Sequence, residues 1–138
     1  MLKNMVIMSM VCALSSVSAV AATPSPDGAS VYIISPANGA VVSNPVTVVF
    51  GLVGMGVAPA GVDKKNTGHH HLLIDTDTPS MGNVIGKDDK HRHFGGGQTQ
   101  TTIELSPGKH SLQLMLADKG HVPHKPPVVS EKITITVK

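Results

Sequence analysis

The chain has 138 residues, and its 11 Lys and Arg residues nearly balance its 9 Asp and Glu residues. This balance excludes the strongly basic face that nucleic-acid-binding domains present, so no nucleic-acid partner is expected. The composition is unusual in one respect: the chain holds 8 histidines but only 1 cysteine.

The first residues have the pattern of a secretory signal. Lys3 precedes an apolar run, Met5 to Leu14, and Ala19-Val20-Ala21 fits the small-x-small pattern of a cleavage site. The apolar run is too short to serve as a stable membrane anchor. We therefore expect a removable signal peptide over residues 1–21, a linker over 22–29 and a periplasmic or secreted location.

The remaining chain, about 117 residues, suits one domain, expected over residues 30–138. No later segment is apolar enough to span a membrane. Cys12 lies inside the predicted signal. The mature protein is therefore expected to have no disulfide and no thiol ligand or nucleophile.

The rest of the chain shows the period-two alternation of short strands, each with one buried and one wet face, and no helical periodicity. The expected strands cover residues 31–34, 46–53, 69–75, 99–105, 110–118 and 129–137, with an irregular strand within 84–94. About seven short strands predict an all-β fold, an immunoglobulin-like antiparallel β-sandwich. A jelly roll or another small barrel is the alternative. The Gly95-Gly96-Gly97 run is interpreted as a flexible loop.

The histidines are clustered in the sequence. They form His69-His70-His71, His91-x-His93 and His121-x-x-His124, with His110 apart. Alternate residues of a strand share a face about 7 Å apart, so His-x-His is a natural pair of ligands for one metal ion. The candidate metal ligands are His69, His71, His91, His93, His121 and His124. His70 is a weaker candidate, because alternation turns it toward the core with Leu72 and Ile74.

The predicted topology brings these clusters together. In an immunoglobulin-like order, the start of the strand at 69–75, the connection near residues 91–93 and the loop holding residues 121–124 lie at one end of the sandwich. His110 would lie at the opposite end. The sequence thus predicts a histidine site at one pole.

Imidazole binds copper, zinc, nickel and iron, and an exported chain without thiols argues against zinc-finger or iron–sulfur chemistry. Met55 follows the strand at 46–53, and its thioether would favour Cu(I), which makes it a further weak candidate ligand. Copper is therefore the expected metal and zinc the alternative. Asp118 or Asp63 could orient an imidazole.

Several segments resemble a family of small exported bacterial domains known as domain of unknown function family 4399. They are Ser35 to Gly39, Gly68 to Asp75, His93 to Thr99 and Gly108 to Ser130, which includes Leu112 to Asp118 and His121-Val122-Pro123-His124. The resemblance covers nearly all of the mature chain. It implies an exported domain with these limits, and it implies no particular activity.

Three functions fit the pattern. The first is a periplasmic metal-binding module, a copper carrier, buffer or sensor, whose neutral imidazoles release the ion on acidification. The second is a metal-dependent redox or hydrolytic enzyme with an open coordination position; no catalytic residue is assigned. The third is a metal-free adhesion or scaffold domain that binds an envelope protein through pH-responsive histidines.

Overall fold

The computed structural model describes residues 21–138, so the predicted signal peptide falls outside the described residues except for its last position. The described part contains strands and no helix. The strands are β1 (Ser30–Ser35), β2 (Val41–Val42), β3 (Val46–Val53), β4 (Gly56–Val57), β5 (Thr67–Ile74), β6 (His91–His93), β7 (Gln100–Ile103), β8 (Gly108–Ala117) and β9 (Ile133–Val137).

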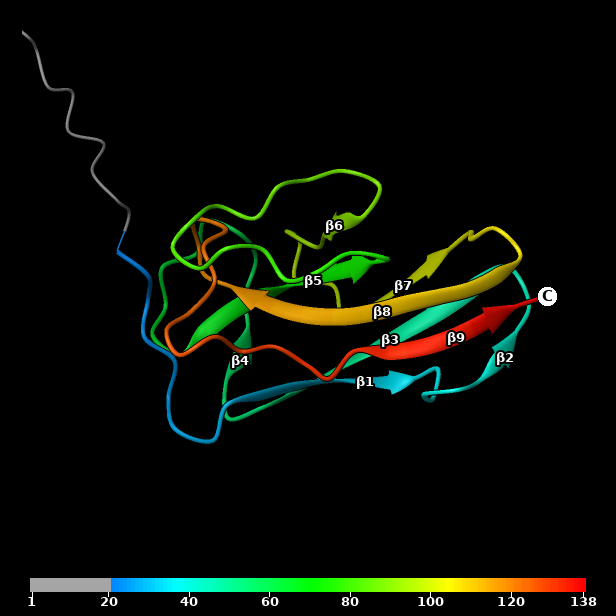
Figure 1. Ribbon diagram of the computed structural model, residues 1–138. Helices are drawn as coiled ribbons and strands as arrows, with labels where there is room; N and C mark the ends of the chain where they lie inside the picture. Colours follow the sequence, from blue (N-terminus) through cyan, green and yellow to red (C-terminus); the bar gives the residue numbers. More distant parts are fainter. Residues whose placement is uncertain (1–20) are drawn as a thin grey trace, which may run out of the picture.

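The strands form two sheets that pack face to face (Figure 1). One sheet has the order β1-β3-β7, and the other has the order β2-β9-β8-β5-β4, with β6 also paired to β5. All pairings are antiparallel except β2 with β9 and β4 with β5. The predicted all-β sandwich with an immunoglobulin-like order is confirmed.

The strand expected within residues 84–94 is β6, and it belongs to the larger sheet. It runs antiparallel to β5, with His71 opposite His93 and Leu73 opposite His91. The alternation of residues alone does not fix such a pairing, because a three-residue strand carries too little pattern to select its neighbour. This pairing places a second histidine-bearing strand directly beside β5.

Alternating residues of both sheets meet in the main core. Val48 of β3, Leu72 of β5 and Leu114 of β8 are each 0% exposed. The core also contains Phe50 and Phe94, whose ring centroids lie 5.0 Å apart. Alternation along these strands fixes which side chains of β5 face inward, and hence which face outward.

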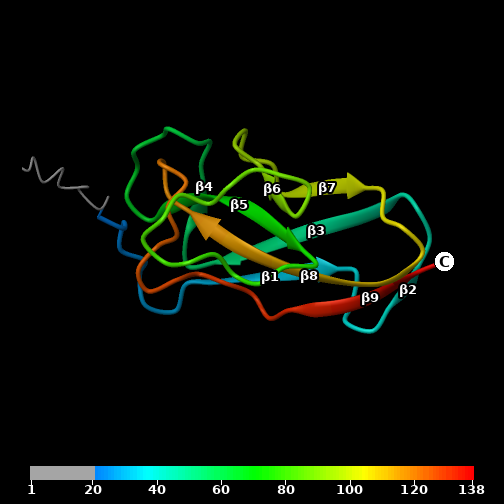
Figure 2. The same cartoon turned by 45° about the horizontal axis from the view of Figure 1, so that its top comes forward.

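The outer face of the larger sheet is also buried at one end. Alternation along the strand expected at 110–118 puts Met115 opposite the core residues Leu114 and Leu116, on the face expected to be wet. This expectation is wrong, because Met115 and Ala117 are fully buried with Ile85 and the partly buried Val129. The reason is the connection between β5 and β6, residues 75–90, here called the covering segment, which arches beside β5 (Figures 1 and 2). The Ile85 amide donates to the His121 carbonyl at 2.8 Å, which ties the covering segment to the β8–β9 connection.

Within residues 21–138, no helix has the length and hydrophobicity needed to cross a membrane.

Candidate metal centre

Strand β5 supplies the first two histidines of the site. His69 and His71 point from the outer face of the larger sheet, because they alternate with the core residues His70 and Leu72. Both are almost completely buried, at 0% and 1% exposure, and their Nε2 atoms lie 3.0 Å apart. The His-x-His spacing thus brings two ring nitrogens together on one face.

Strand β6 adds His93 from the neighbouring position. His93 is the direct antiparallel partner of His71, and its ring centroid lies 5.1 Å from that of His71 and 5.0 Å from that of His69. Gly95 makes room for this ring, because a Cβ added to Gly95 would overlap the His93 imidazole. The glycine interpreted as part of a flexible loop therefore shapes the site.

His121 comes from the β8–β9 connection and completes the group. Its Nδ1 lies 3.1 Å from the Nε2 of His69, and its backbone has a φ of 65°, in the left-handed region. Asp118 holds this turn: its carbonyl accepts the His121 amide at 2.9 Å, and its Oδ1 accepts the Gly120 and Val122 amides. The hydroxyl of Thr23 donates to Asp118 Oδ2 at 2.7 Å.

These residues form the four-histidine cluster: His69, His71, His93 and His121. Each offers one ring nitrogen, and the four nitrogens lie within 4.8 Å of one another, an arrangement that could hold a metal ion. Metal–nitrogen distances near 2.0–2.1 Å place neighbouring ligands of a tetrahedral ion about 3.3 Å apart. The spacings of 3.0 and 3.1 Å around His69 Nε2 are close to this value.

Burial disfavours the charged form of three members of the cluster, His69, His71 and His93. Desolvation, followed by the nearby His121 and His93, lowers the pKa of His69 from 6.5 to about 4. Desolvation, followed by His69, lowers the pKa of His71 to about 3. The pKa of His93 is lowered as well, by desolvation, by His121 and by Lys87. Neutral imidazoles at neutral pH have the free lone pairs that a metal ion needs.

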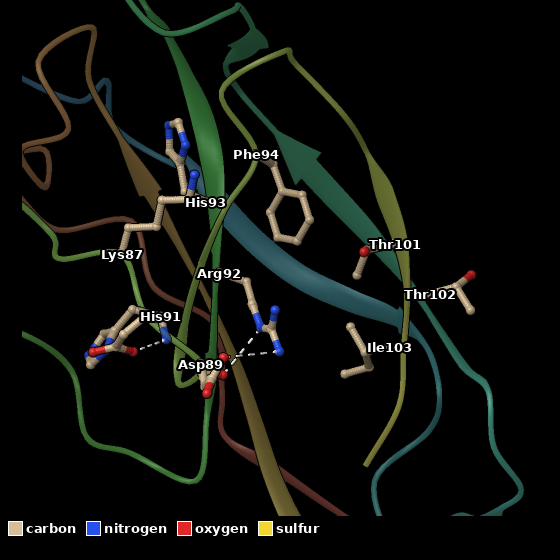
Figure 3. A pocket seen from close by; sticks show the side chains of 10 residues that line it. Lys87, Asp89, His91, Arg92, His93, Phe94, Thr101, Thr102 and Ile103 are labelled. Carbon is tan, nitrogen blue, oxygen red and sulfur yellow. Dashed lines mark hydrogen bonds and ion pairs between the residues drawn. The ribbon is translucent and has the colours of Figure 1, made fainter.

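The structure places the other predicted ligands elsewhere. His91 turns away from His93 (Figure 3), and its Nδ1 lies 2.8 Å from Asp88 Oδ1. His124 is 1% exposed and packs against β5, with its Nε2 2.7 Å from the position that a Cβ on Gly68 would take. His70 lies in the main core, with its ring centroid 5.1 Å from that of Phe50.

Met55 also lies apart from the cluster, because it packs against the main core between the sheets. The four-histidine cluster lies on the outer face of the larger sheet, near the end at which β5 begins and β8 ends. The three histidine groups were predicted to meet at this end, and His93 and His121 do join the two histidines of β5 there. The covering segment lines the site and shelters this part of the outer face. His110 lies at the other end of β8, as expected, and its Nδ1 contacts Asp75 Oδ2 at 2.7 Å.

The two aspartates considered as partners of an imidazole have other roles. Asp63 pairs with Lys119, and Asp118 accepts backbone amides of the turn that carries His121. Asp118 is 5% exposed, and its charge is close enough to His69 to favour a cation there. It supplies a buried negative charge beside the cluster without contacting a ring nitrogen.

Two pockets adjoin β6. One, of 280 Å³, is lined by Val84, Ile85, Lys87, His93 and His121 and is here called the mouth pocket. The other, of 470 Å³, lies between β6 and β7 and is lined by residues that include Arg92, Phe94 and Ile103 (Figure 3). Only the mouth pocket reaches two members of the four-histidine cluster. Sequence reasoning did not find its Ile85 and Lys87, which lie in a segment without strand alternation.

The fold and this cluster define a β-sandwich protein with a candidate four-histidine metal centre on the outer face of one sheet. The chain belongs to the family described as domain of unknown function (DUF4399), whose profile matches residues 48–138. The match runs from Val48 in β3 to the end of the chain and includes all eight histidines, and it confirms the resemblance noted from the sequence. Comparison with the curated proteins and with the solved structures gave no match.

Proposed function

We propose that this protein is an exported metal-binding module that holds one transition-metal ion, copper, in the four-histidine cluster. The observation that carries the proposal is the convergence of four imidazoles from β5, β6 and the β8–β9 connection within 4.8 Å. Only His69 and His71 are near neighbours in the chain. His93 lies 22 residues after His71 and His121 lies 28 residues after His93, so local sequence spacing alone does not explain their meeting.

A purely structural role accounts poorly for this cluster. Nδ1 of His69, Nδ1 of His71 and Nε2 of His93 are buried without a hydrogen-bond partner in the described part of the chain. Leaving a buried polar atom unpaired costs about 1–3 kcal/mol. A bound metal ion would give His93 Nε2 a partner and would offset the remaining cost through the bonds it forms with the ring nitrogens.

The choice of copper rests on the ligand type. For a given set of nitrogen ligands, Cu²⁺ binds more tightly than the other divalent first-row ions, including Zn²⁺. The Met55 thioether gives no support for copper, because Met55 is partly buried against the main core and lies apart from the cluster. Zinc is the alternative, because a tetrahedral site of imidazoles suits it as well.

Export to the periplasm is part of the proposal and rests on the sequence of residues 1–21. In that compartment a site of neutral imidazoles serves as a carrier, buffer or sensor. Two of its ligands, His93 and His121, are only partly buried, so the ion can exchange without unfolding of the sandwich.

The experiment is calorimetric titration of the mature chain, freed of metal, with Cu(II) and Zn(II). We expect one ion per chain, with tighter binding of Cu(II). His71→Ala and His121→Ala should each weaken binding by at least 10-fold, about 1.4 kcal/mol. The matched control is His91→Ala, which removes a histidine of the same strand as His93 and should leave the affinity unchanged. Wild-type binding no tighter than about 100 µM, roughly −5.5 kcal/mol, would contradict the proposal.

A metal-dependent enzyme is the second candidate, and the mouth pocket is the observation in its favour. A pocket bordered by His93 and His121 gives a small molecule access to the ion. Dismutase and esterase assays of the copper- and zinc-loaded protein separate this function from transport, since a carrier gives no turnover above that of the free ion.

A further inference from the structure

A lysine lies at the entrance to the proposed metal site. Lys87 lines the mouth pocket together with His93 and His121. Figure 3 shows the Lys87 side chain extending toward the His93 ring. The Lys87 ammonium group would repel a metal ion bound nearby. An anion between the two would be attracted by both charges.

The carboxylates next to Lys87 in the chain are engaged by other groups. Asp88 Oδ1 accepts the Lys90 and His91 amides and contacts the His91 ring, and Asp89 lies beside Arg92. Among residues 21–138, no carboxylate lies within ion-pair distance of Lys87, whereas Lys119 and Lys132 each have one. The Lys87 ammonium group is thus free to attract an anion into the mouth pocket.

The walls of the mouth pocket favour the same ligand. Ile85 is 4% exposed and Val84 contributes an apolar surface, so the pocket offers little competition from protein hydrogen-bond donors or acceptors. A low-dielectric wall strengthens the attraction between a metal ion, an ammonium group and an anion that lies between them. The pocket volume of 280 Å³ admits a molecule of a few atoms.

We propose that the mouth pocket binds a small monovalent anion as an additional ligand of the metal ion, with Lys87 as the residue that selects its charge. The inference rests on the proposed function, since the anion coordinates the ion held by the four-histidine cluster. Lys87 is a positioning residue: it attracts the anion electrostatically and does not coordinate the metal.

The test uses the Cu(II)-loaded chain and azide as the probe. Azide is titrated while its charge-transfer absorption with Cu(II) and the electron paramagnetic resonance spectrum are followed. Lys87→Gln should weaken azide binding about 3- to 10-fold at low ionic strength, and this difference should shrink in 1 M salt, where the Debye length is about 3 Å. Lys109→Gln, an exposed lysine on β8 at the start of the strand, is the matched control and should leave azide binding unchanged.

Two further readouts distinguish charge selection from a structural effect. Lys87→Gln should bind Cu(II) as tightly as the wild type or more tightly, because a repulsive charge is removed. Misfolding of the variant would instead weaken the binding of both Cu(II) and azide. Binding of the neutral probe imidazole should not respond to Lys87→Gln.

Different results would overturn the proposed function and the anion proposal. If the wild type binds no Cu(II), the proposed function fails. If it binds Cu(II) but shows no azide spectrum, or if azide binds equally well to the wild type and Lys87→Gln, the metal site stands and the anion proposal is overturned.

Discussion

His70 and His71 are neighbours in the chain, yet alternation sends them to opposite faces of β5. His71 joins three other imidazoles, whereas His70 lies in the main core with neither ring nitrogen hydrogen-bonded. Burial lowers the pKa of His70 to about 4. A buried imidazole with no partner is a cost to the fold, and this cost rises when the unfolded chain takes up a proton.

We therefore expect His70→Leu to make the metal-free protein more resistant to acid. The pKa of His70 is lower in the folded protein than its value of 6.5 in the unfolded chain. As the pH falls from 6.5 toward 4, the unfolded chain therefore takes up a proton that the folded protein does not, and the free energy of unfolding decreases. Relative to the wild type, the variant should gain about 2 kcal/mol in free energy of unfolding between pH 7.5 and pH 5. Urea titrations at both pH values measure this change. An equal pH dependence of the two proteins would contradict the assignment of His70 to the core.

The contribution of His110 to stability has the opposite pH dependence. Its hydrogen bond with Asp75 raises the pKa of His110, against a smaller opposing effect of burial. The stabilisation is present below pH 6.5 and is lost as the pH rises through the folded pKa. Asp75→Asn should lower the His110 pKa in an NMR titration and should destabilise the protein more at pH 6 than at pH 8. Because Asp75 is exposed, the effect should stay below about 1 kcal/mol. A His110 pKa that is the same in both proteins would refute the pairing.

Among the elements, β5 and β6 could be predicted to different degrees. The alternation of β5 correctly assigned His69 and His71 to one face and His70 to the other. The sequence could not separate His93 from His91, because residues two apart on a strand share a face; the choice depends on Asp88, which engages His91. Nor could it separate His121 from His124, since the left-handed turn held by Asp118 is a tertiary feature.

A substitution at Gly95 tests whether the position of the His93 ring matters for metal binding. Gly95→Ala should displace the His93 ring and weaken metal binding by about 10-fold, because an added Cβ would overlap the imidazole. Gly86→Ala is the matched control, since its added Cβ would meet nothing within 4 Å. Calorimetric titration compares the two variants. Metal affinity that is equally unaffected in both would remove His93 from the site or show that its ring has room to move.

Substitutions at Asp118 test whether the turn that carries His121 supports metal binding. Asp118→Ala removes the acceptor of the Gly120 and Val122 amides and should destabilise the fold by about 1–3 kcal/mol while weakening metal binding. Asp118→Asn keeps an oxygen acceptor and should retain most of the stability. Thermal unfolding and metal titration of both variants provide the comparison. Equal metal affinity in the wild type and Asp118→Ala would show that His121 needs no such support.

For the molecule as a whole, the order of strands could be predicted and the burial of the site could not. Period-two alternation and turn residues determine the sandwich, because they decide which side chains form the main core. The covering segment carries no such pattern, so its burial of Met115 and Ala117 through Ile85 was not foreseen. That segment shelters the site on the outer face of the larger sheet, because Val84, Ile85 and Lys87 lie beside His93 and His121.

We propose that one metal ion binds among four histidines from β5, β6 and the β8–β9 connection. A crystal structure of the copper-loaded chain, with an anomalous difference map at the copper absorption edge, would show where the ion binds. We expect one strong peak about 2.0–2.1 Å from a ring nitrogen of each of His69, His71, His93 and His121. A map whose only peaks lie at other residues, such as His91 or His110, would contradict it, as would a map without a peak.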